Sequence, residues 1–343
     1  MKTFSVDGRY GRSLIHVGES LDRAGDHIPD NSRLVIVTDE NIRRLYGSRF
    51  PEAPVITIGT GEKTKTLATI EFILREMVNL GCDRSSFLLG IGGGIVCDIA
   101  GFAASVFLRG IRFGFVSTSL LSQVDASVGG KNGVNLDAYK NMVGTFNQPD
   151  FVVCDIDMLP TLPASEISNG LAEIVKHGLI KDISLLEFIE ANRQKALSLD
   201  PDTVFRLVAD SVEIKSVVVQ ADEREAGERR KLNFGHTIGH AVERLDPSGH
   251  GRAVSVGMVA AAQFSLKKGY LDSPDVDRIK DLLTGLNLPV ETDLPREDII
   301  RAAARDKKKE GSDLFFVFLE TIGRARVDKI RYDEMNAFIR DTL

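Results

Sequence analysis

Short apolar runs alternate with helical patterns over the first 155 residues of the chain. Each of five apolar runs leads into a turn-forming segment, which predicts buried strands at 33–41, 54–60, 85–94, 113–119 and 150–156. The segment 66–81 instead repeats its apolar side chains at the i, i+3, i+4 spacing of an amphipathic helix: Leu67, Ile70, Leu74, Met77 and Val78. We expect this helix to end at Gly81. Strands that alternate with helices predict a parallel sheet covered on both faces.

The pattern changes after Pro160 and Pro163. From Glu166 to about Leu286 it is helical almost throughout, and residues 314–327 predict a small hairpin. We therefore predict two domains. The first, residues 1–160, is an α/β domain of the Rossmann-like type, and the second, residues 161–343, is mostly α-helical. A site is expected in the cleft between them.

Composition narrows the class of protein. A length of 343 residues fits two domains. No apolar stretch approaches the ~18 residues of a membrane span, and the N-terminus has no apolar segment typical of a secretory signal. Three scattered cysteines, Cys82, Cys97 and Cys154, predict reduced thiols and a cytoplasmic location. A net charge of −6 argues against nucleic acid as a partner.

A glycine run joins the third predicted strand to the next helix: Gly90, Gly92, Gly93 and Gly94. Glycines at this point let backbone N–H groups approach a phosphate, so the run indicates a dinucleotide site, with Asp98 within reach of its ribose or nicotinamide. It is not G-x-G-x-x-G, because Ile95 stands at the third glycine position. The alternative is a tight turn without a ligand. The segment VGGKNGVN differs from a P-loop, since Asn132 replaces Ser or Thr, so we do not expect ATP chemistry.

Three of the six histidines fall within fifteen residues. His236 and His240 are four apart, on one face of a helix, and His250 follows a Pro-Ser-Gly turn and is predicted to open the next helix. Thr237 replaces the glutamate of H-E-x-x-H, which disfavours a zinc protease. Glu173 lies on an apolar helix, where a carboxylate needs a partner. The cluster predicts a catalytic metal with three protein ligands, although any one histidine alone would be better explained by an ordinary hydrogen bond.

Charged residues also stand within apolar or glycine-rich segments. A single surface lysine is usually only solvated, but the group as a whole predicts a polyanionic substrate. Its members are Arg109, Asp125, Lys131, Lys140, Lys215, Arg229 and the DKKK run beginning at Asp306.

Together these segments resemble the 3-dehydroquinate synthase family over nearly the whole chain. The resemblance is carried by GGGIVCDIAGFAASVFLRG, TSLLSQVDASVGGKNGVN, YKNMVGTFNQP, TLPASEISNGLAEIVKHG, ADEREAGERRKLNFGHTIGHAVE, HGRAVSVGM and RDKKKEG. It implies the dehydroquinate synthase-like fold and a phosphorus–oxygen lyase of the shikimate pathway. Such an enzyme converts the small-molecule sugar phosphate 3-deoxy-D-arabino-heptulosonate 7-phosphate to 3-dehydroquinate and phosphate. The steps are transient oxidation by NAD, phosphate elimination, reduction, ring opening and aldol closure, with Zn²⁺ or Co²⁺ as the metal.

The resemblance also implies roles for particular residues. The metal ligands would be Glu173, His236 and His250. The substrate's hydroxyls and carboxylate would meet Asp125, Lys131, Lys176, Lys215, Arg229 and Asn233. Its phosphate would meet Lys131, Lys140, Asn141, Asn233, His240 and Lys307 or Lys308, with Arg109 supplied by the partner subunit of a homodimer. NAD would contact Asp39, Asn41, Glu62, Lys65, Gly93, Gly94, Asp98, Thr118, Ser119 and Thr161.

Some positions depart from the family pattern: Cys97, Ser117, Ser119, Asn132 and Arg252, the last of which replaces a glutamate two residues after His250. Two other activities stay open, a cyclase acting on another sugar phosphate and a metal-dependent glycerol or alcohol dehydrogenase. A NAD-binding regulatory protein would leave the metal cluster unexplained. The retained SVGGK segment, with Lys215 and Arg229 to pair a substrate carboxylate, favours dehydroquinate synthesis.

Overall fold

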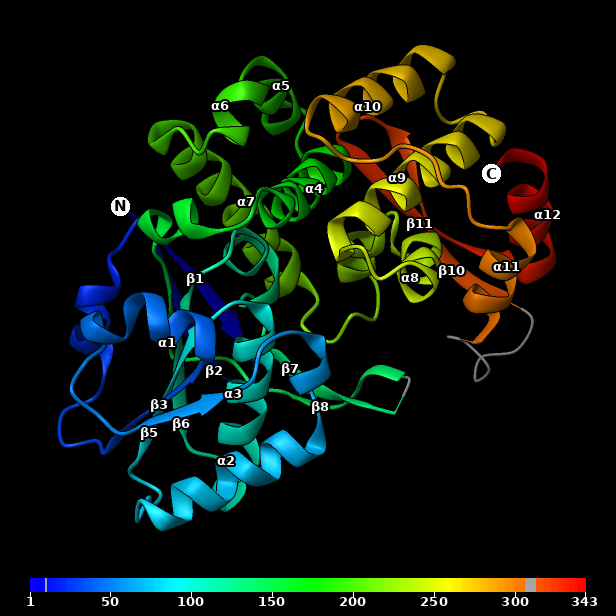
Figure 1. Cartoon of the computed structure of the whole chain (residues 1–343). Coiled ribbons are helices and arrows are strands. Elements are labelled where there is room, and N and C mark those ends of the chain that lie inside the picture. The colour runs from blue at the N-terminus through cyan, green and yellow to red at the C-terminus, as the bar shows by residue number, and fades with distance from the viewer. Residues whose placement is uncertain (10, 138, 306–312) are drawn as a thin grey trace. The chain divides into compact units, whose positions relative to one another are not determined.

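The computed structural model describes residues 1–9, 11–137, 139–305 and 313–343 (Figure 1). The chain forms two compact units. The first comprises Met1–Leu162 and Lys215–Glu223, and the second comprises Pro163–Ile214 and Arg224–Leu343. Among the described helices, none combines the length and the apolar character needed to cross a bilayer.

The first unit is built on a seven-stranded sheet of order β1-β2-β9-β6-β5-β3-β4. The five strands predicted from the apolar runs all form, and neighbours among them pair in parallel, which confirms the predicted α/β class. They are β3 (Leu34–Asp39), β4 (Val55–Ile58), β5 (Phe87–Gly92), β6 (Arg112–Ser117) and β9 (Phe151–Cys154). Sequence analysis did not predict the antiparallel hairpin of β1 (Lys2–Gly8) and β2 (Gly11–Val17), which extends the sheet beside β9.

Apolar burial explains why this sheet forms. Every residue of the central strand β5 is buried, as expected for a strand covered on both faces. The covering helices are α1 (Glu40–Tyr46), α2 (Leu67–Asn79) and α3 (Gly94–Val106). Thr66 caps the start of α2, and Gly81, at φ +68°, follows its last turn, which confirms the predicted end of that helix.

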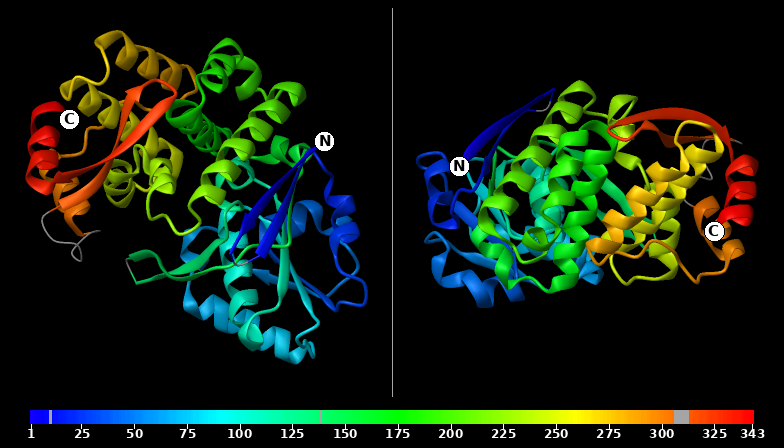
Figure 2. Two further views of the ribbon diagram at one scale, coloured as in Figure 1. Left: turned by 180° about the vertical axis from the view of Figure 1, so that it is seen from behind. Right: turned by 90° about the horizontal axis from the view of Figure 1, so that it is seen from above.

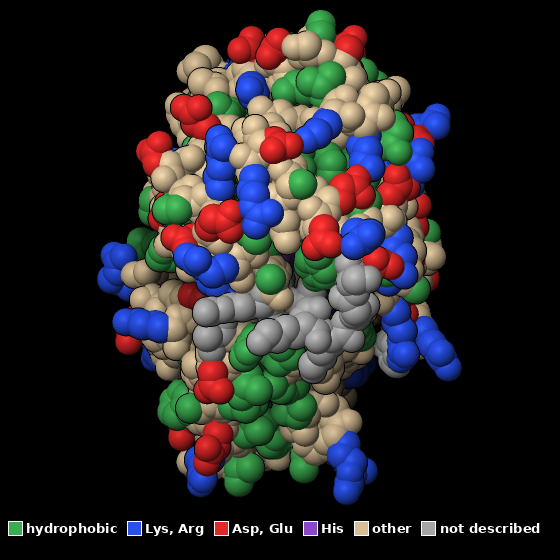
Figure 3. All heavy atoms as spheres, turned by 90° about the vertical axis from the view of Figure 1, so that its right-hand side faces the viewer, with side chains coloured by type: hydrophobic (Ala, Val, Ile, Leu, Met, Phe, Trp, Pro, Cys, Tyr) green, Lys and Arg blue, Asp and Glu red, His purple; other side chains and the backbone are tan. Residues whose placement is uncertain are grey.

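A second hairpin, of β7 (Lys131–Leu136) and β8 (Tyr139–Phe146), also belongs to the first unit and was not predicted. Large apolar side chains stand 38–50% exposed on it: Leu136, Tyr139, Met142 and Phe146. Figure 3 shows apolar side chains gathered on one face of the molecule. Exposed apolar surface of this kind is typical of an interaction site.

The second unit is mostly helical, which confirms the predicted change of pattern. Its helices are α4 (Ala164–Lys181), α5 (Ile183–Ala191), α6 (Arg193–Leu197), α7 (Pro201–Ala221), α8 (His236–Leu245), α9 (His250–Lys267), α10 (Ser273–Gly285), α11 (Arg296–Arg305) and α12 (Tyr332–Thr342). The predicted hairpin forms as β10 (Asp313–Thr321) and β11 (Arg324–Arg331), and β10 packs on α9 (Figure 2). Every residue from Ile167 to Ile180 is buried, so α4 is a core helix.

The last residues of α7 belong to the first unit, because polar side chains in and just after this end of the helix form hydrogen bonds with that unit. Gln220 donates to the Ser5 carbonyl at 2.6 Å. Just beyond the helix, the Glu223 carboxylate accepts from the backbone N–H of Arg9 at 2.8 Å and from Gln148 at 3.1 Å. These bonds tie Lys215–Glu223 to the N-terminal hairpin and to the segment before β9.

Candidate functional site

A buried carboxylate lies at the centre of a cluster in the second unit. Glu173 of α4 has no exposed surface. Its Oε1 lies 3.6 Å from Nε2 of His236 and 3.6 Å from Nε2 of His250. This oxygen accepts no hydrogen bond from the described residues, although a buried polar atom without a partner is costly. One carboxylate oxygen and two imidazole nitrogens therefore converge on one point, and this donor set suits zinc or cobalt.

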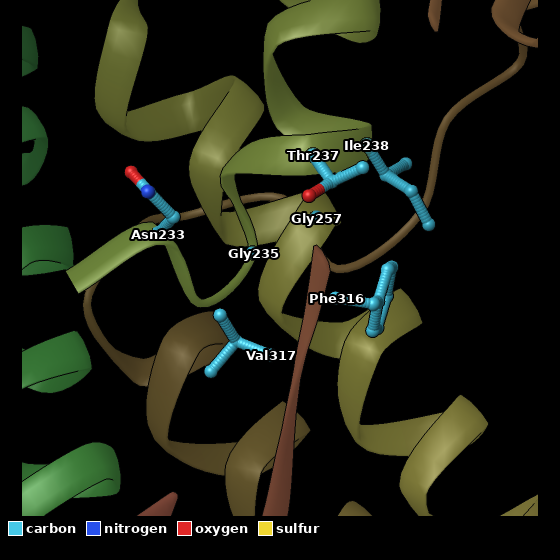
Figure 4. Close-up of a pocket in the computed structure, with 7 residues that line it drawn as sticks. All are labelled: Asn233, Gly235, Thr237, Ile238, Gly257, Phe316 and Val317. Carbon is cyan, nitrogen blue, oxygen red and sulfur yellow. The ribbon is translucent and has the colours of Figure 1, made fainter. Parts of the chain in front are cut away.

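Close packing of α8 on α9 fixes the position of His236. Gly235 precedes it with φ +77°, a conformation that favours glycine. A Cβ added at Gly257 of α9 would lie 1.9 Å from the Gly235 carbonyl oxygen. Figure 4 shows the loop of Gly235 against the helix of Gly257, with Phe316 and Val317 of β10 nearby. The two helices can approach this closely only where both residues lack side chains.

Both imidazoles turn their other nitrogen toward an oxygen acceptor. Nδ1 of His236 lies 3.1 Å from the Phe234 carbonyl oxygen. His250, the first residue of α9 as predicted, has Nδ1 3.4 Å from Oε2 of Glu243. For a neutral imidazole, an acceptor at this place favours the proton on Nδ1 and leaves the Nε2 lone pair on the side of Glu173, where a metal ion would bind.

The charges around Glu173 suit a metal ligand. Burial alone would raise the pKa of Glu173, but the ammonium of Lys176, which bonds its Oε2, and the two imidazoles hold that pKa well below its usual range. Burial, reinforced by Lys176, lowers the pKa of His236 to about 3. Partial burial opposes the charged form of His250, yet the nearby Glu173 and Glu243 carboxylates raise its pKa to about 10, so this ring would give up a proton when a metal binds. Glu173 is thus ionised and His236 neutral, which are the states that bind metal.

His240 completes the histidine cluster. Its side chain is exposed, and its ring centroid lies 5.1 Å from that of His236 and 6.1 Å from that of His250. All three imidazoles of the sequence cluster therefore lie together, and His240 has the access to solvent that proton exchange requires.

Another group of possible ligands, in the first unit, was missed by sequence analysis: His16, Glu19 and His27. The rings of His16 and His27 stack at 4.2 Å with an interplanar angle of 20°. Stacked rings send their in-plane lone pairs along nearly parallel lines, which does not suit convergence on one ion. His27 instead pairs with the buried Glu19 carboxylate at 2.7 Å, so we interpret this group as a structural contact.

The predicted dinucleotide residues of the first unit gather at one edge of its sheet. Asp39 ends β3, Gly93 follows β5, and Thr118 follows β6. Carboxyl ends of neighbouring parallel strands meet at one edge, where such folds bind nucleotides. Gly93 and Gly94 open α3, whose first turn has no side-chain cap, so its backbone N–H groups can face a phosphate. A Cβ at Gly94 would come within 2.8 Å of the Ala126 Cβ.

Lys65 links two other predicted residues of this region. Its Nζ lies 2.5 Å from a carboxylate oxygen of Asp98 and 2.5 Å from Oδ1 of Asn141. Burial raises the pKa of Asp98, and Lys65 opposes that shift. Glu62 accepts a hydrogen bond from the Asn135 side chain at 2.7 Å, and Oδ1 of Asn135 accepts one from the Asn141 N–H at 2.8 Å. The structure thus joins NAD candidates to Asn141, which had been assigned to phosphate.

The remaining NAD candidates have local bonds. Asp39 caps α1 by accepting from the Ile42 N–H at 2.9 Å, and Asn41 is exposed on the first turn of that helix. Thr161 bonds the Tyr46 hydroxyl at 2.9 Å. Ser119 donates to the Ser122 hydroxyl at 2.9 Å.

The candidate substrate residues are divided between the units. In the first unit, Lys215 of α7 is 5% exposed and pairs with Asp125. Lys131 and Lys140 are exposed on the β7–β8 hairpin, and Arg109 is exposed in a turn with φ +71°. The second unit holds Arg229, which is 2% exposed, and Asn233, which donates to Glu225. Lys307 and Lys308 lie outside the described residues.

Three departures from the family pattern have identifiable surroundings. Cys97 is buried in α3, with Sγ 3.8 Å from the Gly92 carbonyl oxygen. Ser117 donates to the Ser122 hydroxyl at 2.6 Å and so joins the serine chain that holds Ser119. Arg252 lines a surface pocket of about 500 Å³ with residues of α8 and of the segment after α10. Two residues along a helix is a rotation of about 200°, so Arg252 is directed away from the side of α9 that carries His250.

Comparison with known proteins gives the same family for both halves of the chain. Residues 55–169 match the family model described as 3-dehydroquinate synthase N-terminal, and residues 170–309 match the one described as 3-dehydroquinate synthase C-terminal. A protein of Alkaliphilus metalliredigens (strain QYMF) named 3-dehydroquinate synthase is 38% identical over 337 residues, which are 95% of this chain and 94% of that protein.

Solved structures of related cyclases superpose on the chain. A 2-deoxy-scyllo-inosose synthase complexed with carbaglucose-6-phosphate, NAD⁺ and Co²⁺ matches with a TM-score of 0.88 at 26% identity, covering 100% of both chains. A 2-epi-5-epi-valiolone synthase from Streptomyces hygroscopicus subsp. jinggangensis 5008, with NAD⁺ and Zn²⁺ bound, matches with a TM-score of 0.86 at 26% identity, covering 99% of this chain and 97% of that one.

Proposed function

The chain belongs to the 3-dehydroquinate synthase family, and from that premise we propose that it converts 3-deoxy-D-arabino-heptulosonate 7-phosphate to 3-dehydroquinate and phosphate. The observation that carries the proposal is the convergence of two Nε2 atoms on the unsatisfied, buried Oε1 of Glu173. Proteins of this fold that are 26% identical hold NAD⁺ with Co²⁺ or Zn²⁺. We assign NAD and one of these ions to this chain as cofactors.

Glu173, His236 and His250 would hold the ion, and the edge of the sheet at Gly93, Gly94 and Thr118 would hold NAD. When bound, the ion supplies Lewis acidity at a substrate hydroxyl, and NAD⁺ supplies a reversible hydride acceptor, so the overall reaction is redox-neutral. The other proposed NAD contacts are Asp39, Asn41, Glu62, Lys65, Asp98, Ser119 and Thr161.

The chain's own charges would orient the substrate and stabilise charge as it develops. Lys215, which pairs with Asp125, and Arg229 are cations that are almost fully buried. They suit the substrate carboxylate, together with Asp125, Lys176 and Asn233. The phosphate would be held by Lys131, Lys140, Asn141, His240 and Lys307 or Lys308. His240 is exposed beside the metal ligands, so it can exchange a proton with the phosphate or with water.

Arg109 would reach the phosphate of a partner subunit in a homodimer. Within the described part of the chain it makes no hydrogen bond or ion pair with another residue, and it stands exposed in a turn. The exposed apolar side chains of the β7–β8 hairpin belong to the same unit and suit a protein interface. A cytoplasmic location fits free thiols at Cys82, Cys97 and Cys154.

A comparison of two substrates tests this assignment against the activities of other cyclases. The heptulosonate phosphate and glucose 6-phosphate, the sugar that carbaglucose-6-phosphate imitates, are each supplied with NAD⁺ and Zn²⁺, and phosphate release is measured. We expect phosphate and 3-dehydroquinate in equal amounts from the heptulosonate and none from the hexose. Turnover of the hexose alone would assign the chain to another cyclase.

A further inference from the structure

Glu243 lies behind the metal cluster, on the side away from Glu173. It is seven residues after His236 and three after His240, so α8 carries all three on one face. Its side chain is only 11% exposed, and its Oε2 lies 3.4 Å from Nδ1 of His250. A carboxylate this deeply buried needs a partner that repays its lost hydration, and His250 provides one.

The two histidines of the cluster have equivalent surroundings with one difference. For each, Nε2 faces Oε1 of Glu173 at 3.6 Å and Nδ1 faces an oxygen. Behind His236 this oxygen is a backbone carbonyl, fixed by the fold, whereas behind His250 it belongs to the Glu243 side chain. The acceptor behind His250 can therefore be removed by a single substitution.

His250 also depends more on such a partner. It begins α9 directly after Gly249, which has φ +139°, and its side chain is 26% exposed, compared with 11% for His236. Less packing around the ring leaves more freedom to rotate. Without an acceptor behind Nδ1, the ring can protonate Nε2 instead and lose the lone pair that faces Glu173.

We propose that Glu243 is a positioning residue, which accepts the Nδ1–H of His250 and so holds its Nε2 lone pair toward the metal. This inference rests on the metal site proposed above. Carboxylates that bond the far nitrogen of a metal-binding histidine strengthen metal affinity about 10- to 100-fold. Glu243 would act through His250 and would not touch the ion.

The other possible role for Glu243 is that of a ligand, because His240, Glu243 and His250 also form a group with metal-binding atoms close together. The directions of the ring nitrogens oppose this role. Glu243 is on the Nδ1 side of His250 and Glu173 on its Nε2 side. The two nitrogens of an imidazole point away from each other, so an ion bound at Nε2 with Glu173 lies out of reach of Glu243.

Zinc affinity of the full chain provides the test, with a competing chelator and no substrate. Glu243→Gln should raise the Kd for zinc about 10-fold, since an amide oxygen accepts more weakly than a carboxylate, and Glu243→Ala about 100-fold. Glu187→Gln, on the exposed surface of α5, is the matched control and should leave the Kd unchanged. Circular dichroism and the melting temperature of the metal-free proteins verify folding.

Cobalt absorption then separates positioning from ligation. With Co²⁺ at saturation, Glu243→Gln and the unaltered protein should give the same spectrum, because the ligands are the same. A changed spectrum at saturation would make Glu243 a ligand and overturn the proposal, as would a zinc Kd within about twofold of the unaltered value. If the unaltered protein bound no zinc, the proposed metal site would fail as well. Normal zinc binding in both proteins would refute the role of Glu243 alone.

Discussion

The two candidate regions of the molecule are built from different parts of the chain. In the first unit, the proposed nucleotide edge is formed by backbone at strand ends and by glycines at the start of α3. In the second, the proposed metal cluster is formed by side chains of three helices, α4, α8 and α9, around one buried carboxylate. A site formed by backbone atoms tolerates a substitution wherever there is room for the new side chain. A site formed by side chains is lost when any one of them is replaced. The departures at Cys97 and Ser117 lie in the first region, and Glu173, His236 and His250 all fit the family pattern.

The largest expected effect is that of Glu173→Gln. The substitution removes the ligand charge, so zinc content should fall from about one ion per chain to almost none, and activity should fall with it. It also leaves the buried ammonium of Lys176 without its carboxylate, which should lower the free energy of unfolding by about 3–5 kcal/mol. Metal analysis and denaturant unfolding measure the two losses.

The double variant Glu173→Gln, Lys176→Met is the control for that cost. It should be more stable than the single variant and equally free of zinc. Full zinc occupancy in the single variant would remove Glu173 from the ligand set.

Arg109→Ala and His236→Ala should each abolish turnover, because one lacks a phosphate contact and the other a metal ligand. If Arg109 acts in the partner's site, mixing and reassociating the two inactive proteins creates some intact sites. With random pairing about half the dimers are mixed, and one of their two sites is complete, so activity should return to about a quarter of the unaltered value. No recovery, with mixed dimers present by mass spectrometry, would mean that Arg109 serves its own subunit or neither.

Two glycine substitutions should separate the regions. Gly257→Ala places a Cβ against the Gly235 carbonyl oxygen, so it should cost about 1–3 kcal/mol of stability and weaken zinc binding without changing the intrinsic NAD site. Gly94→Ala crowds Ala126 at the start of α3, so it should weaken NAD binding and leave zinc binding intact. Calorimetric titration with each cofactor distinguishes them, and equal losses of both cofactors in both variants would contradict the division.

The smallest expected effect is at Arg252, which departs from the family pattern two residues after the proposed ligand His250. Arg252→Glu restores the usual residue of the family on the side of α9 away from His250. It should change the Kd for zinc by less than about threefold, because solvent screens the charge. A change of tenfold or more would show that Arg252 acts on the cluster.

Structural features that depend on a few neighbouring residues could be predicted from the sequence. The five inner strands, the end of α2 at Gly81 and the start of α9 at His250 each depend on neighbouring side chains or on one turn. The ion pair of Glu173 with Lys176 is local in the same way, since residues three apart on a helix share a face.

Contacts between residues far apart in the sequence could not be predicted from such local patterns. Strand β1 has a weak apolar pattern and is held by its pairing with β2 and by contacts from the end of α7, more than 200 residues away. The pair of Asp125 with Lys215 joins residues 90 positions apart. Glu243 was missed although its i+7 spacing from His236 was visible, because nothing in the sequence alone relates it to His250, which lies on another helix.

The proposal on which the others depend is that one chain uses NAD and a metal to release phosphate without net oxidation. The most direct measurement follows NADH absorbance, phosphate and 3-dehydroquinate together during steady turnover of the heptulosonate phosphate by the zinc-loaded protein. We expect equal amounts of phosphate and 3-dehydroquinate while NADH absorbance stays flat. One NADH accumulating per product, without release of phosphate, would contradict it and favour a dehydrogenase.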